Sequence, residues 1–380
     1  MQIDKDYIVK IRRQLHQIPE VGFDLPKTIG LVCKELDAMG IPYTRDIGKS
    51  CVIATLNEGV GNKTIALRAD MDALPIEEET GLPFSSTHPG KMHACGHDCH
   101  TAMLLGTAKA LKAMEKDIKC CVKFVFQSAE EILGGAKSIC DTGFMDSVDE
   151  IIGCHINPEH PTGTILQSRG CDSACSRGFE IHLYGRSSHV ARPHLGVDAI
   201  AMANRVYSDI QFMRARELNP IDSAVVGIGS IHGGETGNIL CDHVVMIGTI
   251  RTTSTEVNDY IYRRLGEIAA SVSADMGGTA QVNTLRYSPA LYNDLSVADN
   301  LAAAAKKIGI SEFLPKPGSM GGEDFAYYLQ HKPGAMFDLG VKVPDKPTVP
   351  LHNGKLILNE DALDIAPKIF IQYILDQMEK

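Results

Sequence analysis

The chain has 380 residues, of which 44% are hydrophobic and 22% are charged, and its formal net charge is -10. This length exceeds one typical hydrophobic core, so we expect two domains in an ordinary globular protein. The acidic balance, without a cluster of Lys and Arg, argues against nucleic acid as a partner. No apolar run reaches the roughly 18 residues of a membrane span, and residues 1–13 do not resemble a signal peptide. We therefore expect a cytoplasmic protein with no membrane partner.

The 11 cysteines could suggest a disulfide framework. They are spread through segments with strand and helix patterns, in a chain long enough to build its own core. We therefore predict free, mostly buried thiols. A small molecule remains the expected class of partner.

Helical and strand patterns alternate over the first 154 residues. Apolar residues at helical spacing predict helices over 6–18, 28–39, 101–114 and 135–141. Short apolar runs predict strands over 51–56, 64–67, 120–126 and 150–154. The turn-rich segment 57–62 predicts that the first two strands form a hairpin or lie as neighbours. This alternation predicts an α/β fold with a mainly parallel sheet covered by helices.

The pattern changes near residue 178. Strands are predicted over 179–184, 224–231, 243–249 and 279–285, and helices over 197–213 and 257–274. The order βαββαβ is that of a ferredoxin-like unit. After Pro289, we predict a helix over 297–308, a strand over 335–339 and a last helix from Glu360. We therefore expect a discontinuous catalytic domain, 1–177 and 288–380, interrupted by an inserted domain, 178–287.

Ionisable side chains follow three of the predicted strands. Asp70 and Asp72 follow the second strand, Glu130 and Glu131 follow the third, and His155 follows the fourth. In open α/β sheets, ligands bind beyond the carboxyl ends of the strands. These positions therefore predict an active site at that edge.

Residues 92–100 contain three histidines, two cysteines and an aspartate. Cys95 and His97 are separated only by Gly96, and both residue types hold borderline divalent cations. Taken alone, the segment could be a solvated histidine-rich loop. Together with Glu131, His155 and His352, these two residues could bind one or two divalent ions. Glu130 would then remain available as a base towards a metal-activated water.

At this point the sequence resembles the M20 metallopeptidases, in particular the amidohydrolase branch that includes aminoacylase-like, hippurate and auxin-conjugate hydrolases. The motifs that carry the resemblance are Arg68–Pro75, Met92–Asp98, Ser128–Glu131, Gly185–His189 with Pro193–His194, Gly237–Ile239 and Gly322–Phe325. The resemblance covers nearly the whole chain. It implies hydrolysis of the amide bond of N-acyl amino acids.

The resemblance implies two divalent metal ions per subunit, held by Cys95, His97, Glu131, His155 and His352. Cys95 would lie between the two ions, and zinc, cobalt, nickel and manganese all suit such ligands. Glu130 would be the general base, and Asp72 would orient a ligand. Asp70 stands where other branches carry a metal-binding histidine, so we leave it outside the shell.

The resemblance also assigns roles to the inserted domain. His189 would stabilise the oxyanion, while Asn238 and Arg251 would contact the substrate, Arg251 through a carboxylate. Closure about hinges near 176–178 and 287–289 would complete the site. We further expect a homodimer formed through the inserted domain.

Two positions depart from the family pattern: Ser128 replaces a common proline, and Cys99 replaces a usual glycine. Neither change removes a ligand, and we expect His93 and His100 to be structural or outer partners. Two alternatives remain open. One is a peptidase of the same superfamily, and the other is a binding protein on the scaffold of a former enzyme, which the complete set of ligands disfavours.

Overall fold

The computed structural model describes residues 3–310 and 313–378. The chain forms two compact units. The first unit contains Met1–Asp172, Tyr292–Pro317 and Asp324–Lys380, and the inserted unit contains Ser173–Leu291 and Gly318–Glu323. The roles assigned above to a catalytic and an inserted domain stay predictions.

Within the described residues, an eight-stranded sheet forms the centre of the first unit, in the order β1-β2-β4-β3-β5-β14-β6-β13. Its strands are β1 (Tyr43–Thr44), β2 (Val52–Leu56), β3 (Thr64–Asp70), β4 (Cys121–Gln127), β5 (Glu150–Pro161), β6 (Ile165–Gln167), β13 (Phe313–Pro315) and β14 (Gly334–Lys342). The central strands β4, β3, β5 and β14 pair in parallel, whereas β2 and β6 join them antiparallel. The predicted α/β fold with a parallel core is confirmed.

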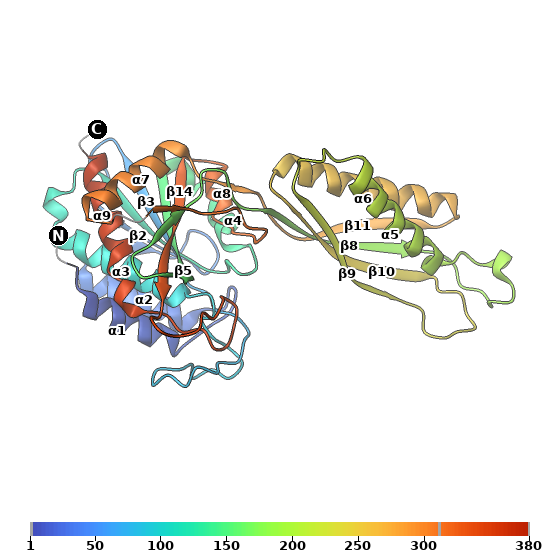
Figure 1. Ribbon diagram of the computed structural model, residues 1–380, viewed down its shortest axis with the longest axis horizontal. Coiled ribbons are helices and arrows are strands. Elements are labelled where there is room, and N and C mark those ends of the chain that lie inside the picture. Colours follow the sequence, from blue (N-terminus) through green and yellow to red (C-terminus); the bar gives the residue numbers. More distant parts are fainter. Residues whose placement is uncertain (1–2, 311–312, 379–380) are drawn as a thin grey trace. The chain divides into compact units, whose positions relative to one another are not determined.

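Helices surround this sheet: α1 (Lys5–His16), α2 (Pro26–Met39), α3 (His97–Ala113), α4 (Gly135–Cys140), α7 (Leu295–Lys307), α8 (Ala326–Leu329) and α9 (Ile365–Gln377). Ile8, Ile11 and Leu15 recur at helical spacing along α1 and are at most 1% exposed, because this stripe faces the core. Helix α1 packs against α3, and α7 packs against α9 (Figure 1). None of the helices in the described part of the chain is long and apolar enough to cross a membrane.

Two predictions about strands were wrong. Strands β2 and β3 form no hairpin, because β4 lies between them and pairs with both. The buried, apolar β4 occupies the centre of the sheet, which turn residues at 57–62 could not reveal. Strand β5 continues to Pro161, so His155 lies within the strand, opposite Asp338 of β14, and does not follow the strand.

Two helix boundaries also differ from the prediction. Helix α3 begins at His97 and not at Thr101, because Gly96 caps it with a left-handed backbone. The polar residues 97–100 hid this first turn, since they are buried although they break the apolar pattern. The last helix begins at Ile365, after a separate 3-10 turn over Glu360–Ala362.

The inserted unit contains an antiparallel sheet in the order β11-β8-β10-β9. Its elements are β8 (Cys175–Tyr184), α5 (Ala199–Arg216), β9 (Ala224–Gly233), β10 (His243–Thr252), α6 (Thr255–Asp275) and β11 (Thr279–Ser288). The predicted βαββαβ order is confirmed. The short strands β7 (Cys171–Ser173) and β12 (Leu291–Tyr292) pair near its two ends in sequence.

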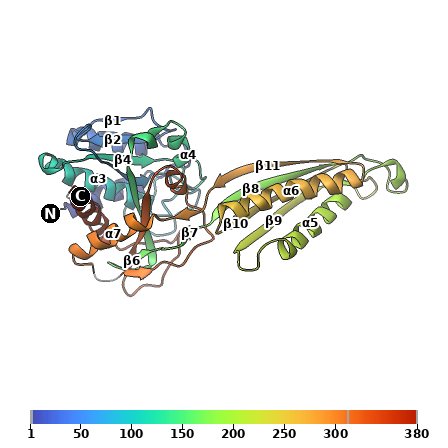
Figure 2. The ribbon, with the colours of Figure 1, turned by 90° about the horizontal axis from the view of Figure 1, so that it is seen from above.

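The two faces of the inserted sheet differ. Helices α5 and α6 lie side by side over one face (Figure 2), where they pack on Phe179, Ile181 and Leu183 of β8. The alternating residues Glu180, His182 and Tyr184 point to the other face and are partly or largely exposed. We call this second side the open face, because no helix of the inserted unit covers it among the described residues.

Candidate metal centre

A tight turn at Gly96 positions Cys95 and His97. Gly96 has φ +81°, a conformation that residues with side chains rarely adopt, and a Cβ there would lie 2.5 Å from Ile156 Cγ1. Only glycine therefore fits between the two predicted ligands. Both neighbours are buried, with 7% of Cys95 and 1% of His97 exposed.

All five predicted ligands meet in the first unit. Cys95, His97 and His155 each offer one ligand atom within 4.8 Å of the others, and Cys95 forms a second such group with Glu131 and His352. Cys95 Sγ lies 3.5 Å from His155 Nε2. Glu131 Oε1 lies 3.5 Å from His352 Nε2 and 3.9 Å from His97 Nε2. Segments that are far apart in sequence thus contribute to one cluster.

The donor set fits a divalent cation. Both ring nitrogens of His97 and Oε1 of Glu131 are buried without a hydrogen bond among the described residues, which is costly unless another group binds them. His155 donates from Nδ1 to the backbone oxygen of Ile156 (2.7 Å), which leaves Nε2 available. Burial raises the pKa of the Cys95 thiol well above its usual range, so the thiolate requires a nearby cation. Sulfur, nitrogen and oxygen donors together suit borderline metals.

Asp72 holds the backbone that carries the two adjacent glutamates. The N–H of Glu130 donates to Asp72 Oδ1 (3.0 Å), and the N–H of Glu131 donates to Oδ2 (3.2 Å). Asp72 Oδ1 also lies 3.6 Å from His97 Nδ1. Ala129, just before these glutamates, has φ +55°, which is a strained conformation for alanine. Asp72 therefore contacts both a candidate ligand and the loop of the candidate base.

His100 links Asp70 to the strand that carries His155. His100 donates from Nδ1 to Asp70 Oδ1 (2.6 Å), and its Nε2 accepts the N–H of Ile156 (2.9 Å). Burial lowers the pKa of His100 to about 4, although Asp70 acts in the opposite direction. Because both nitrogens are used, neutral His100 is a partner of the ligand strand and has no lone pair left for a metal ion.

A buried network around Arg68 supports Asp70 from the other side. Arg68 donates to Asp70 Oδ2 (2.8 Å), to Asp324 Oδ1 (3.0 Å) and to Gln127 Oε1 (2.9 Å). Burial alone would raise the pKa of Asp70, but His97 and Arg68 hold it well below the usual range. We did not predict this network. Its signal in the sequence is the pair of charges at Arg68 and Asp70 in an otherwise apolar strand, since buried charges require partners.

A second charged cluster ties α1 to the start of α3. His16 donates from Nδ1 to Asp98 Oδ2 (2.8 Å), and Arg12 Nε lies 2.8 Å from the same oxygen. His16 Nε2 lies 3.3 Å from Glu78 Oε1. Burial opposes ionisation of Glu78, but the hydrogen bond from His16 lowers its pKa to about 2. Asp98 directly follows His97, so this cluster anchors the ligand segment.

The three predicted substrate contacts lie in the inserted unit, in two separate places. The N–H of Val190 donates to the backbone oxygen of Asn238 (3.1 Å), so the segments of His189 and Asn238 are adjacent, just before β10. Arg251 is the penultimate residue of β10 and pairs with Ser176. The 10 residues of β10 span about 30 Å. One chain therefore places His189 and Asn238 at the opposite end of β10 from Arg251, too far for one small substrate to touch both.

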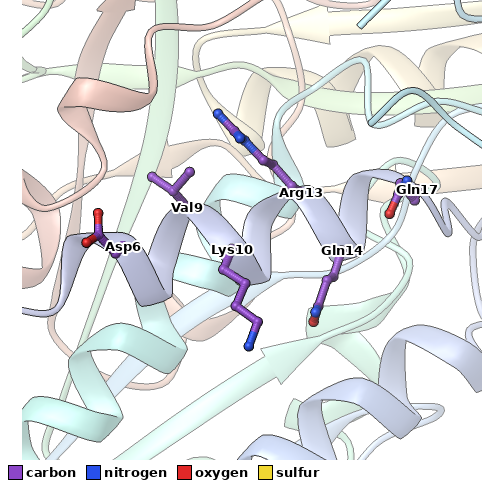
Figure 3. Close-up of a pocket in the computed structure, with 6 residues that line it drawn as sticks. All are labelled: Asp6, Val9, Lys10, Arg13, Gln14 and Gln17. Atoms are coloured by element: carbon purple, nitrogen blue, oxygen red, sulfur yellow. The ribbon is translucent and has the colours of Figure 1, made fainter. Parts of the chain in front are cut away.

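A surface hollow runs along α1 and is lined by Asp6, Val9, Lys10, Arg13, Gln14 and Gln17 (Figure 3). All six side chains come from this helix or the residue after it. The hollow contains none of the candidate ligands.

The family of the chain follows from its sequence as a whole. A family model described as peptidase family M20/M25/M40 matches residues 66–376. The chain belongs to this family. The predicted family membership is thus confirmed, and the family is one of hydrolases.

Several known proteins are similar to this chain over most of their length. An N-acetyl-L-cysteine deacetylase from Bacillus subtilis is 39% identical over 88% of this chain and 80% of its own length. An N-acetyldiaminopimelate deacetylase from Streptococcus uberis is 36% identical over 94% of this chain and 95% of its own. The crystal structure of the Bacillus subtilis YXEP protein, described as a dinuclear metal-binding peptidase from the M20 family, is 32% identical, with a TM-score of 0.83, and covers 99% of this chain and 98% of its own.

Proposed function

We propose that this chain hydrolyses the amide bond of N-acyl amino acids to a carboxylate and a free amino acid. The observation that carries the proposal is the meeting of five ligand-type side chains in one cluster, which includes the buried Cys95 and His97. Glu130 lies next to it and shares a ligand group with His97 and Glu131. The names of the two deacetylases describe the same reaction class in similar chains.

Two divalent ions would be held by Cys95, His97, Glu131, His155 and His352. When bound, they would polarise the substrate carbonyl and lower the pKa of the attacking water. The orphaned nitrogens of His97 support this assignment, and so does the dinuclear relative. We propose zinc, cobalt, nickel or manganese as the metal, because each accepts these donors.

Glu130 would accept the proton of the attacking water and deliver it to the leaving nitrogen, so that the amine departs neutral. Its side chain is mostly buried, with 7% exposed, and its backbone is held by Asp72. Asp72 binds the N–H groups of Glu130 and Glu131 through its two oxygens. It therefore fixes the backbone position of the candidate base relative to that of the neighbouring candidate ligand.

His189 would donate a hydrogen bond to the oxyanion, Asn238 would contact the substrate, and Arg251 would bind the substrate carboxylate. The separation of these residues along β10 supports the expected homodimer. Arg251 would bind the substrate of its own chain, and His189 and Asn238 would act on the substrate of the partner chain. A single substrate then need not span the roughly 30 Å between the two ends of β10.

The test is the release of free amino acid by metal-depleted enzyme before and after addition of each candidate metal. The substrates are N-acetyl and N-benzoyl amino acids and the corresponding dipeptides. We expect activity only after metal is restored, and at least about 10-fold higher kcat/KM for the N-acyl compounds, because no carboxylate has been identified to receive a free α-amino group. Faster hydrolysis of dipeptides would favour the peptidase alternative. Full activity without metal would refute the proposal.

A further inference from the structure

Two arginines lie on the open face of the inserted sheet, on either side of β8. In the register of the sheet, Arg251 of β10 pairs with Ser176, and Arg286 of β11 pairs with Gly178. Directly paired residues of neighbouring strands share a face. Ser176 and Gly178 alternate with the buried Phe179 and therefore belong to the open face. Both guanidinium groups consequently start from the same side of the sheet.

A bulge in β11 directs the side chain of Arg286 to the open face. The register of β11 and β8 shifts between Thr284 and Arg286, so that Leu285 is an extra residue in β11. Such bulges re-aim the side chains that follow them. A Cβ on Gly178 would lie 3.2 Å from Arg286 Cγ, so the side chain of Arg286 lies over this glycine. Any larger residue at position 178 would displace it.

Neither arginine has a carboxylate partner among the described residues. Within the described residues, Arg251 donates to Thr249 Oγ1 and to the backbone oxygen of Met320, both at 3.3 Å. Arg286 makes no ion pair in the described part of the chain. By contrast, other arginines of the inserted unit bind carboxylates: Arg177 binds Asp259, Arg205 binds Asp275 and Arg264 binds Glu217.

The next residue of β8 on the open face, Glu180, carries a carboxylate, but Asn283 donates to its Oε1 (3.1 Å) and His182 Nε2 lies 3.1 Å from the same oxygen. Burial lowers the pKa of Arg251, and the positive charge of Arg286 lowers it further. Ser176, paired with Arg251, is completely buried, and its Oγ makes no hydrogen bond within the described residues. A free hydroxyl donor at Ser176 and two arginines without a carboxylate partner are groups that would bind an anion.

We propose that Arg251 and Arg286 form a subsite for two carboxylates, so that the enzyme prefers N-acyl amino acids with an acidic side chain. Arg251 binds the α-carboxylate and Arg286 binds the side-chain carboxylate. This inference rests on the proposed function. The backbones of β10 and β11, with β8 between them, are about 10 Å apart, which leaves room for a short dicarboxylate between the guanidinium groups. A substrate with one carboxylate would leave Arg286 without a partner.

The decisive comparison is between N-acetyl-L-glutamate and N-acetyl-L-glutamine, which differ by one charge and have nearly the same shape. For the wild type, we expect kcat/KM to be at least about 10-fold higher for the glutamate compound, since a charged hydrogen bond contributes about 10- to 100-fold. Arg286→Gln should remove this preference through KM and leave the glutamine compound within about 3-fold. Arg216→Gln, on the exposed part of α5, is the matched control and should behave as wild type.

A binding measurement separates this inference from the proposed reaction. Calorimetry with glutarate and with pentanoate compares a dicarboxylate with a monocarboxylate of the same length, without turnover. We expect glutarate to bind wild type at least about 10-fold more tightly than pentanoate, and Arg286→Gln to lose that difference.

Equal affinity of wild type for glutarate and pentanoate would overturn the subsite. An equal fall in kcat/KM for the glutamate and glutamine compounds in Arg286→Gln would also overturn it, because both arginines would then bind the α-carboxylate. If wild type hydrolyses no N-acyl amino acid, the proposed function fails. The glutarate measurement then decides the subsite by itself.

Discussion

The candidate metal centre and the predicted substrate contacts differ in how exposed their side chains are and in how firmly the surrounding structure holds them. Cys95 and His97 are at most 7% exposed, and their neighbours are fixed by a glycine turn and by Asp72. His189 and Asn238 are exposed and lie on loops joined by backbone hydrogen bonds. The buried donors Cys95 and His97 suit a permanently bound ion, whereas exposed residues suit a substrate that must enter and leave. Substitutions in the two regions should therefore fail in different ways.

The largest effect should come from a ligand. Cys95→Ala removes the donor shared by two ligand groups, so bound metal and activity should fall together, with kcat/KM reduced by about 10³-fold. Cys33→Ala, at a half-buried cysteine outside the cluster, is the control. Metal analysis after dialysis measures the first quantity and amino-acid release the second. Unchanged metal content in Cys95→Ala would remove Cys95 from the shell.

The next effect should come from the exposed region and should spare the metal. His189→Ala removes a hydrogen bond made mainly in the transition state, so kcat should fall about 10²-fold with little change in KM. Metal content should equal that of wild type. If His189→Ala keeps full kcat on a good substrate, the oxyanion role is wrong.

The same variant tests the proposed homodimer. Co-expression of His189→Ala with Glu130→Gln should restore about one quarter of wild-type activity, because half of the dimers are mixed and each mixed dimer has one intact site. Each variant expressed alone is the control. No recovery in a sample shown to contain mixed dimers would mean that His189 acts within its own chain or not at all.

Asp72→Ala should have a smaller effect, and this effect should extend to both catalysis and metal binding. It removes the acceptor for two backbone N–H groups, so activity or metal affinity should fall about 10- to 100-fold. Asp72→Asn keeps one acceptor oxygen and should lose less. Asp46→Ala, at an exposed aspartate, is the control. Wild-type kcat and metal affinity in Asp72→Ala would show that Ala129 and the turn hold the loop without Asp72.

The smallest effect concerns stability in acid. The pKa of Glu78 is lowered from 4.5 to about 2, so its contribution to stability is present above pH 4.5 and is lost as the pH falls towards 2. Glu78→Gln should lower Tm at neutral pH by about 2–4 °C, and its Tm should fall less than that of wild type between pH 5 and pH 3. Glu79→Gln, whose Lys355 contact is exposed, is the control. Parallel Tm curves for Glu78→Gln and wild type would contradict the assigned ion pair.

The sequence predicted much of the fold because periodicity reports burial directly. The βαββαβ order of the inserted unit and the parallel core were visible in this way, and the five predicted metal ligands lie close together. The position of β4 between β2 and β3 was not, because strand pairing depends on contacts distant in sequence. The start of α3 was missed because buried polar residues break the pattern on which the prediction rests.

Other features of the site could not be derived from the sequence at all. The separation of His189 from Arg251 depends on the length and register of β10. Arg286 belongs to no motif, and only the bulge at Leu285 and the glycine at 178 reveal which face it occupies. Hydrogen bonds such as those of His100 require coordinates, since they depend on the direction of each ring.

Glu130→Gln, with metal content and kcat measured on the same preparation, tests the proposed reaction most directly. The substitution keeps the shape of the side chain but removes its ability to accept a proton. We predict wild-type metal content and a kcat at least about 10²-fold below that of wild type on the best N-acyl amino acid. A fully metal-loaded Glu130→Gln enzyme with near wild-type kcat would contradict the assignment of Glu130 as the general base.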